Sequence, residues 1–493
     1  MWTIPPRAEA IEQRDRLRLP SRMLIDGEPC AALSGEELAV LSPSDGNRFA
    51  GVPRAAAADV DRAVAAARKA FDTGPWPRLS SFDRAQILRR AATIIRERQA
   101  DFALIETWDN GKPLGESQWA ALAAADVFDF YAGWADKFHG EQIPLRSGHL
   151  DILFHVPVGV IGCITPWNFP TTQATFKAVP AIAMGNTVVH KPAEQAPLTA
   201  LLLAEICLEA GVPPGVWNVV TGLGEEAGTA IVGHPGVDAV TFTGSTETGR
   251  AVMRLASDRL KPVSLECGGK SANIIFADAD YDAALTGAVP GAFYNQGEVC
   301  NAGCRILVQK PIYERFCADF AERAKKIVVG DPFDSATEMG AIISLEQLEK
   351  DVAYSRIGRE EGAHLLSGGD RIAGNGYFMT PTTFGDVTPR MRIAQEEIFG
   401  PIVALIPFSH EEDAIAIAND TPYGLAAGVW TKDLNRSIQM IRALQSGTVW
   451  VNTFGPWDIA TPWTGFKHSG IGTEWGREML RFVTRPKNAW LAV

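Results

Sequence analysis

The sequence has little cysteine and no long apolar segment. Seven cysteines are scattered through 493 residues, and the eight histidines show no spacing typical of metal ligands. Cys300 and Cys304 form a C-x-x-x-C pair, but no second pair accompanies them, so we predict neither a disulfide framework nor a metal site. The best apolar run, 198–208, is interrupted by Thr199 and Glu205 and is far shorter than the roughly 20 residues of a membrane span.

Positive charge is also scarce. The chain has 46 Lys and Arg against 58 Asp and Glu, a formal net charge of −12. This balance disfavours nucleic acid and anionic membranes as partners. The first 20 residues mix charges with prolines and lack the apolar region of a signal peptide, so we expect a cytoplasmic protein.

The length and the hydrophobic rhythm predict a multidomain α/β protein. A chain of 493 residues exceeds the size at which one core keeps growing, so two or three domains are expected. Helical periodicity appears over 55–73 and 83–107. Short apolar runs then alternate with helical stretches, which is typical of a doubly wound, nucleotide-binding parallel sheet. These predicted strands are 158–164, 187–190, 217–220, 239–243 and 263–265.

A second α/β region begins near residue 267 and extends to about 462. Helices are predicted at 312–328 and 434–445, and strands at 305–309, 402–407 and 447–452. The tail, 482–493, returns to extended character.

Two short strings carry the chemistry. Residues 264–270 read S-L-E-C-G-G-K and residues 295–303 read N-Q-G-E-V-C-N-A-G. They offer a carboxylate, Glu266, and a thiol, Cys300, each beside glycines that permit close approach of backbone or substrate. The alternatives are a solvent-facing glutamate and a small buried cysteine, the commoner fate of a free thiol. The pair favours covalent chemistry.

Four further strings accompany these two. They are P-W-N-F-P at 166–170, K-P-A-E at 191–194, F-T-G-S at 242–245 and E-E-I-F-G-P at 396–401. Taken in chain order, the six strings match motifs of the NAD(P)-dependent aldehyde dehydrogenase superfamily. The chain resembles this superfamily from about residue 22 to the C-terminus. The N-terminal extension and G-G-K-S-A-N-I at 268–274 are also similar to the bacterial aminoaldehyde branch, such as γ-glutamyl-γ-aminobutyraldehyde dehydrogenases.

The resemblance implies oxidation of an aldehyde to its acid. An aldehyde surrenders hydride readily only after a nucleophile has made it tetrahedral, and Cys300 is expected to supply that nucleophile. Asn168 and the Cys300 N–H would hold the oxyanion. Once hydride has moved to NAD, Glu266 would activate the water that hydrolyses the thioester. Lys177 is expected to support proton relay or cofactor contacts.

The cofactor is expected at the carboxyl ends of the strands. The stretch from Gly244 through Ser245 to Gly249 follows a predicted strand and opens a helix, whose N-terminus suits a pyrophosphate, although Ser245 could be merely an N-cap. By resemblance, Lys191 and Glu194 hold the adenosine ribose, and the carboxylate favours NAD over NADP. The other positions assigned to the cofactor are Ile164, Trp167, Gly224, Leu265, Glu397 and Phe399.

The substrate pocket is assigned by resemblance alone. Its expected residues are Gln173, Phe176, Phe293, Val299, Asn301, Phe454, Trp457 and Asp458. Aromatic side chains suit a flat or apolar aldehyde, whereas a carboxylate at the tunnel mouth would attract a cationic tail. The sequence therefore does not decide between amino, aromatic and aliphatic aldehydes as substrates. It also does not decide whether Cys267 or Cys304 has a redox role.

The expected fold class is α/β, with a doubly wound parallel-sheet NAD-binding domain, a second α/β catalytic domain and a small β oligomerisation element. The first comprises 1–136 and 155–266, the second 267–465, and the third 137–154 and 466–493. A homodimer or homotetramer is expected. Two other functions are considered, a CoA-acylating semialdehyde dehydrogenase and a non-catalytic NAD-binding or structural protein. Glu266 counts against the CoA-acylating enzyme, which needs no hydrolytic base.

Overall fold

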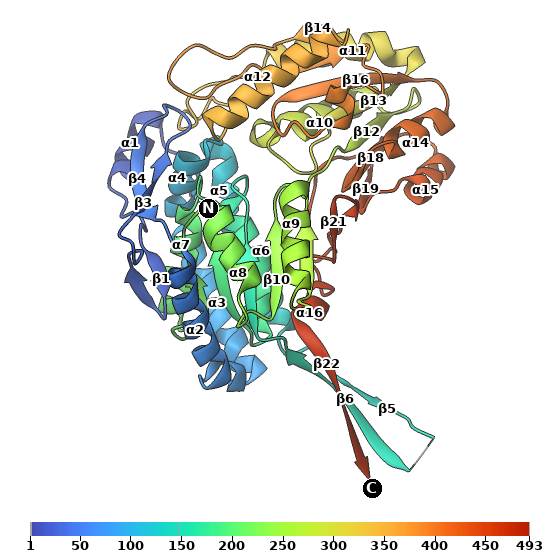
Figure 1. The fold of residues 1–493 in the computed structure, drawn as a ribbon. Coiled ribbons are helices and arrows are strands. Elements are labelled where there is room, and N and C mark those ends of the chain that lie inside the picture. The colour runs from blue at the N-terminus through green and yellow to red at the C-terminus, as the bar shows by residue number, and fades with distance from the viewer. Residues whose placement is uncertain (1, 147, 493) are drawn as a thin grey trace.

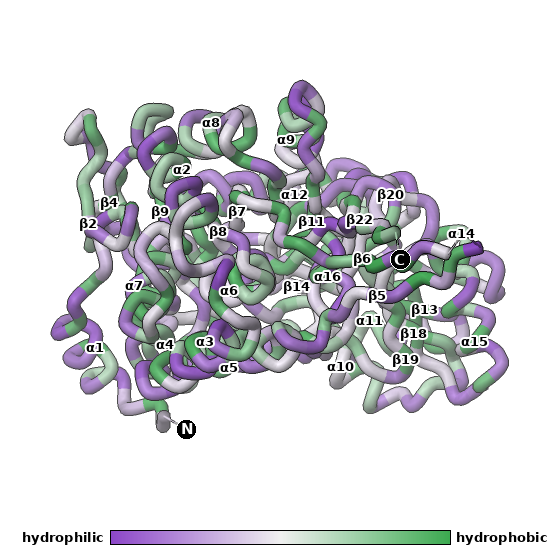
Figure 2. The backbone as a smooth tube through the Cα atoms, turned by 90° about the horizontal axis from the view of Figure 1, so that it is seen from below, coloured by the Kyte–Doolittle hydropathy of each residue, from purple (hydrophilic) through white to green (hydrophobic). Residues whose placement is uncertain are grey.

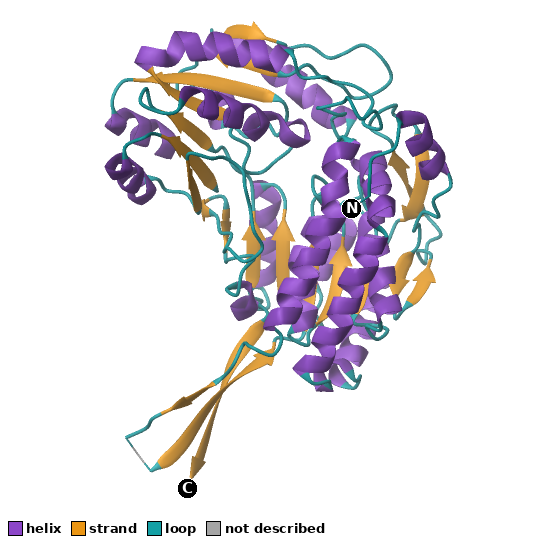
Figure 3. Ribbon diagram, turned by 180° about the vertical axis from the view of Figure 1, so that it is seen from behind, coloured by secondary structure: helices purple, strands orange, loops and turns teal. Residues whose placement is uncertain are grey.

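The computed structural model describes residues 2–146 and 148–492. The chain forms two α/β lobes and a long antiparallel arm that projects away from them (Figure 1). Each lobe is built on its own sheet, with helices on both faces (Figure 3). The predicted α/β fold class is confirmed.

The first lobe contains an eight-stranded sheet. Its strands are β1 (Met23–Ile25), β2 (Glu28–Cys30), β7 (Val160–Ile164), β8 (Thr187–Lys191), β9 (Trp217–Val219), β10 (Ala239–Thr243), β11 (Val263–Glu266) and β21 (Gly470–Ile471). They lie in the order β2-β1-β9-β8-β7-β10-β11-β21, and β9 through β11 are parallel. Strand order therefore reverses between β7 and β10, which is where doubly wound sheets open a ligand crevice at their carboxyl ends.

Helices cover both faces of this sheet. They are α1 (Arg7–Asp15), α2 (Ala57–Asp72), α3 (Ser81–Glu97), α4 (Gln99–Asn110), α5 (Leu114–Trp134), α6 (Pro170–Ala183), α7 (Leu198–Ala210), α8 (Thr229–Gly233), α9 (Thr246–Ser257) and α16 (Met479–Phe482), with short turns η1 (Trp76–Arg78) and η2 (Gly224–Gly228). One apolar core lies under α2, α8 and α9, and a larger core lies under α3 to α7. Both faces of the sheet are buried, which explains why its strands were recognisable in the sequence as continuous apolar runs.

The single helix predicted over 83–107 is wrong. The structure breaks it at Arg98, whose backbone leaves the helical region (φ −98°, ψ 23°), into α3 and α4. After the break, α4 turns inward and buries most of its residues, whereas α3 keeps an exposed face. The apolar spacing continues across the break, so periodicity alone did not detect it.

The second lobe contains a seven-stranded sheet. Its strands are β12 (Ala272–Ile275), β13 (Arg305–Gln309), β14 (His364–Ser367), β15 (Thr382–Gly385), β16 (Ile402–Phe408), β18 (Ala426–Trp430) and β19 (Thr448–Val451). The order is β14-β15-β16-β13-β12-β18-β19, and only β14 is antiparallel to its neighbour. Its helices are α10 (Tyr281–Phe293), α11 (Lys310–Lys325), α12 (Leu345–Glu360), α13 (Arg392–Gln395), α14 (Glu411–Asn419) and α15 (Leu434–Ala443), with η3 (Tyr294–Gly297) after α10.

The arm is a three-stranded antiparallel sheet. It consists of β5 (Glu141–Ile143), β6 (His149–Pro157) and β22 (Thr484–Ala492), with β6 in the middle. Two smaller pairs, β3 (Glu37–Leu41) with β4 (Arg48–Pro53) and β17 (Tyr423–Gly424) with β20 (Phe466–Lys467), lie elsewhere. Strand β21 pairs with β11 in the first lobe, and the tail joins the arm from residue 484.

Hydrophobic and hydrophilic stretches are interleaved along the chain (Figure 2). Among residues 2–146 and 148–492, no helix is both long enough and apolar enough to cross a lipid bilayer.

Candidate active site

Cys300 lies in a tightly constrained loop between η3 and β13. Asn295 and Gln296 adopt left-handed backbone conformations (φ 46° and 57°), which are unusual for non-glycine residues. A Cβ added to Gly269 would overlap the Cys300 carbonyl oxygen. Glycine at position 269 thus lets the thiol loop touch the segment that follows β11, so the two motifs lie together.

Glu266 is the last residue of β11 and is buried. Neither of its carboxyl oxygens has a hydrogen-bond partner of good geometry in the described part of the chain. Burial and the nearby Glu474 carboxylate raise the pKa of Glu266 to about 7, although Lys177 and the Cys300 thiol partly offset the rise. A carboxyl group that titrates near neutral pH is suited to accept a proton from water.

Cys300 is half-buried and faces a cavity. Burial, followed by the neighbouring Glu266 carboxylate, raises the pKa of the Cys300 thiol well above its ordinary value. The raised pKa favours the thiol over the thiolate. A thiol must lose its proton before it becomes a strong nucleophile.

Asn168 is held rigidly beside the thiol loop. Its side-chain Nδ2 donates to the Glu298 carbonyl oxygen (2.9 Å), and its own carbonyl oxygen accepts from Lys112 Nζ (2.9 Å) and Asn295 Nδ2 (3.0 Å). An amide nitrogen carries two N–H donors. One is occupied by Glu298, so the other remains for a ligand.

Lys177 is fully buried on α6. Its ammonium forms an ion pair with Glu474 and donates to the Thr241 hydroxyl (3.2 Å). The Glu474 carboxylate is one of the groups that raise the pKa of Glu266, and Lys177 lowers it. Sequence reasoning missed Glu474, because 297 positions separate it from Lys177 and no motif links them.

Several predicted cofactor residues lie at the carboxyl ends of adjacent parallel strands. Ile164 and Lys191 end β7 and β8, Leu265 is the second-last residue of β11, and Gly244 follows β10. Lys191 Nζ bonds to Glu194 (3.2 Å).

Two further predicted cofactor elements follow strands of the first sheet. The Ser245 hydroxyl caps α9 by accepting from the Thr248 N–H (3.1 Å), so its N-cap role is realised, and Gly249 is buried in the first turn of the helix. Gly224 begins η2, the turn that follows β9. The open N-terminus of α9 suits a phosphate group.

Glu397, Phe399 and Trp167 converge from the second lobe and the β7 loop. Glu397 accepts from the Gly269 N–H (2.8 Å), and burial raises the pKa of Glu397 to about 7. The Phe399 ring packs edge-on against Trp167 with centroids 5.3 Å apart, and its backbone is left-handed (φ 66°). Such strain is typical of functional sites. The carboxylate, the helix end and the switch-point crevice together fit a dinucleotide.

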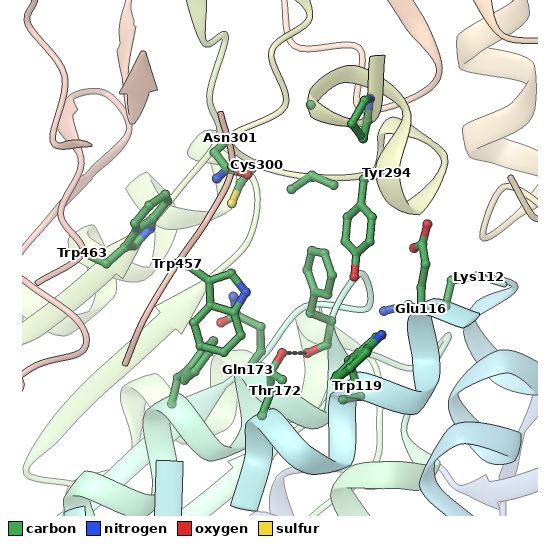
Figure 4. A pocket seen from close by; sticks show the side chains of 18 of the residues that line it. Lys112, Glu116, Trp119, Thr172, Gln173, Tyr294, Cys300, Asn301, Trp457 and Trp463 are labelled. Atoms are coloured by element: carbon green, nitrogen blue, oxygen red, sulfur yellow. Dashed lines mark hydrogen bonds between the residues drawn. The ribbon is translucent and has the colours of Figure 1, made fainter. Parts of the chain in front are cut away.

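A cavity of about 330 Å³ opens beside Cys300 (Figure 4). Its wall is largely aromatic, with Trp119, Phe169, Phe176, Tyr294, Phe454, Trp457, Trp463 and Trp475. Six of the eight predicted substrate residues line it, namely Gln173, Phe176, Val299, Asn301, Phe454 and Trp457.

Two predicted substrate residues do not line this cavity. Phe293 is the last residue of α10 and packs in the core of the second lobe against Phe320, with centroids 5.9 Å apart. Its neighbour Tyr294 occupies the wall instead, because the helix ends between them. Asp458 is exposed and accepts from the Ala460 N–H (2.8 Å) in a turn outside the wall. Within 2–146 and 148–492, no three or more His, Cys, Asp or Glu side chains cluster in a way that could hold a metal ion.

A thiol placed between the carboxyl edge of a doubly wound sheet and an aromatic cavity is typical of dehydrogenases that work through a cysteine adduct. Residues 31–489 match the aldehyde dehydrogenase family, and the chain belongs to it. The predicted resemblance is thereby confirmed. The aminoaldehyde branch stays a prediction.

Named relatives and solved structures resemble the whole chain. Aldehyde dehydrogenase family 2 member B4 of Arabidopsis thaliana is 47% identical, covering 92% of this chain and 85% of the relative. The mitochondrial benzaldehyde dehydrogenase of Antirrhinum majus is 45% identical, covering 95% and 90%. A crystal structure of an indole-3-acetaldehyde dehydrogenase complexed with NAD+ superposes with a TM-score of 0.98 at 41% identity, covering 99% of this chain and all of that one.

Proposed function

We propose that this protein oxidises an aldehyde to its carboxylic acid with NAD as the electron acceptor. The observation that carries the proposal is the meeting of Cys300 and the buried Glu266 between a switch-point crevice and an aromatic cavity. Relatives named as aldehyde dehydrogenases and structures described as NAD+ complexes support it. A CoA-acylating enzyme would have no need of Glu266 as a base that activates water, so we do not favour it.

The cofactor would lie along the carboxyl edge of the first sheet. Lys191 and Glu194 would hold the adenosine ribose, the N-terminus of α9 at Ser245 the phosphates, and Glu397 with Phe399 the nicotinamide end. A carboxylate repels a 2′-phosphate, so Glu194 favours NAD over NADP. When bound, NAD supplies the acceptor for the substrate hydride.

The protein's own groups would carry out the covalent steps. The Cys300 sulfur adds to the carbonyl carbon, and its thiol proton passes to solvent. The spare N–H of Asn168 and the Cys300 backbone N–H then stabilise the oxyanion, an interaction typically worth about 10²–10³ in rate per donor. After oxidation to the thioester, Glu266 takes a proton from water, the resulting hydroxide attacks the carbonyl carbon, and the C–S bond breaks to release the acid.

Lys177 and Glu474 would set the proton affinity of Glu266. The buried ammonium lowers the pKa of Glu266 and the buried carboxylate raises it, so the pair holds the base close to neutrality. Lys177 is thus proposed as a positioning and electrostatic residue.

The substrate class proposed is an aromatic aldehyde. Eight aromatic side chains form the wall, and flat rings pack well against such walls. Relatives named for benzaldehyde and indole-3-acetaldehyde are in line with this. The exposed position of Asp458, outside the wall, weakens the case for a cationic substrate.

The arm is proposed to pair subunits in a homodimer or homotetramer. Strand β22 forms a nine-residue edge with exposed Trp490 and Leu491, and Phe154 of β6 is also exposed. An edge strand has unpaired backbone groups that can pair with a further strand. The proposed location is the cytoplasm, although relatives from plants and mammals are named mitochondrial.

An NADH absorbance assay with an aldehyde panel tests the function. We expect NADH formation with NAD and an aromatic aldehyde in the absence of CoA, and one equivalent of acid for each NADH. Dependence on CoA would select the acylating enzyme, and no NADH with any aldehyde would refute the proposal.

A further inference from the structure

The cavity has a polar end away from the thiol. Figure 4 shows Cys300 and Asn301 on one side of the cavity, and Tyr294, Glu116 and Lys112 on the other. Aromatic rings fill much of the wall between them. A ligand whose carbonyl carbon meets Cys300 would extend its far end toward this second polar group.

Lys112 is not free to bind a ligand. Its buried ammonium donates to Glu106 (2.7 Å) and to the Asn168 carbonyl oxygen (2.9 Å), and it lies 4.3 Å from the centroid of the Phe169 ring. These two hydrogen bonds use two of the three N–H donors of the ammonium group, and its charge is already paired with Glu106. The polar end therefore offers no spare cation to a ligand carboxylate.

Glu116 and Tyr294 retain free hydrogen-bonding capacity. The Glu116 carboxyl accepts from the Asn295 backbone N–H (3.0 and 3.3 Å) and from no other group that the structure describes. The Tyr294 hydroxyl makes no hydrogen bond to another described residue. Burial raises the pKa of Glu116 to about 8, so the group is mainly an uncharged acid at neutral pH. A neutral acid beside a phenol offers both donors and acceptors, and no charge to pair with an ammonium.

We infer that Tyr294 and Glu116 form a recognition site for a neutral hydroxyl group at the end of an aromatic aldehyde farthest from its carbonyl. The inference rests on the proposed aldehyde oxidation and narrows its substrate class. A hydroxyl group donates one hydrogen bond and accepts others, so it matches both partners. Tyr294 is 42% exposed, so water can reach its hydroxyl when no ligand is bound, and we expect a preference of the size that one neutral hydrogen bond gives.

The test compares two pairs of substrates that differ only in the distal hydroxyl. They are 4-hydroxybenzaldehyde against benzaldehyde, and 4-hydroxyphenylacetaldehyde against phenylacetaldehyde, each assayed with NAD. The wild type should show a higher kcat/KM for the hydroxylated member of at least one pair. Tyr294→Phe should lower that ratio by about 2- to 10-fold, the usual range for one neutral hydrogen bond, mainly through KM.

Two further variants sharpen the result. Glu116→Leu should also lower the ratio of kcat/KM for the hydroxylated over the unsubstituted aldehyde. This variant also loses the contact with Asn295, which can slow the reaction with both aldehydes. The ratio measured at the remaining activity then still tests the inference. Tyr281→Phe removes a tyrosine hydroxyl that bonds to Asp319 outside the cavity, so its ratio should equal that of the wild type.

An unchanged ratio in both Tyr294→Phe and Glu116→Leu would overturn the inference and leave the proposed function intact. A wild-type preference for the unsubstituted aldehydes would do the same. Absence of NADH with every aldehyde would instead refute the proposed function itself.

Discussion

Replacing Glu266 by Gln tests the hydrolytic step most directly. The amide keeps the size of the side chain but cannot take a proton from water. A general base typically contributes about 10²–10⁴-fold, so thioester hydrolysis should slow by that factor while the first NADH forms normally. Rapid mixing should therefore give a burst of one NADH per active site followed by slow turnover, and mass spectrometry should detect protein carrying the acyl group.

The pH dependence follows from the same carboxyl. Burial holds the pKa of Glu266 at about 7, above the ordinary value, so the active, ionised base is lost as pH falls through 7. Roughly one-tenth is ionised at pH 6 and roughly nine-tenths at pH 8, so the wild-type hydrolysis rate should rise several-fold across this interval. Glu266→Gln should lose this dependence.

A matched control is Glu205→Gln on α7. Burial also raises the pKa of Glu205, but this carboxyl lies outside the cavity wall. Its turnover and pH profile should match the wild type. Steady wild-type turnover by Glu266→Gln, without an acyl-protein, would refute the reasoning.

Three other predictions address the remaining groups. Cys300→Ala should abolish NADH formation but leave NAD binding, measured by titration calorimetry; residual turnover would remove the thiol from the reaction. Glu194→Ala should narrow the ratio of kcat/KM for NAD over NADP, and an unchanged ratio would contradict the ribose assignment. Lys177→Met leaves the Glu474 carboxylate buried without its ion pair, which typically costs about 3–5 kcal/mol, so urea unfolding should shift to lower concentration. The double variant with Glu474→Gln should recover part of that loss, and no recovery would show that the pair is not the cause.

The strands were largely predictable because the lobes bury both faces of their sheets. The segments 239–243 and 305–309 were predicted with the bounds that the structure has, since each is a short apolar run between clear turn signals. Helix ends were less predictable. The break at Arg98 depends on how α4 turns into the interior, which local spacing does not encode.

The structure places Glu266 and Cys300 close together, but no sequence motif identifies the groups that support them. Glu474 reaches Lys177 across the chain, and Glu116 meets the thiol loop through a backbone N–H that no side-chain motif records. Phe293 was assigned to the substrate pocket by resemblance, whereas the structure places Phe293 in the core and its neighbour Tyr294 in the cavity wall. A helix end decides which of two neighbouring rings faces the cavity, and resemblance alone could not resolve it.

The hydrogen bonds of Asn295 connect the far wall of the substrate cavity to the residues around the catalytic thiol. Its backbone N–H is held by Glu116 at the far wall, and its side chain is tied to the carbonyl oxygen of Asn168 beside the thiol. A displacement of about 1 Å in a catalytic group can cost about 10²-fold in rate. Anyone re-engineering this enzyme for a new aldehyde would therefore find that selectivity and turnover shift together, and compensating changes in the 294–297 segment would be needed to separate them.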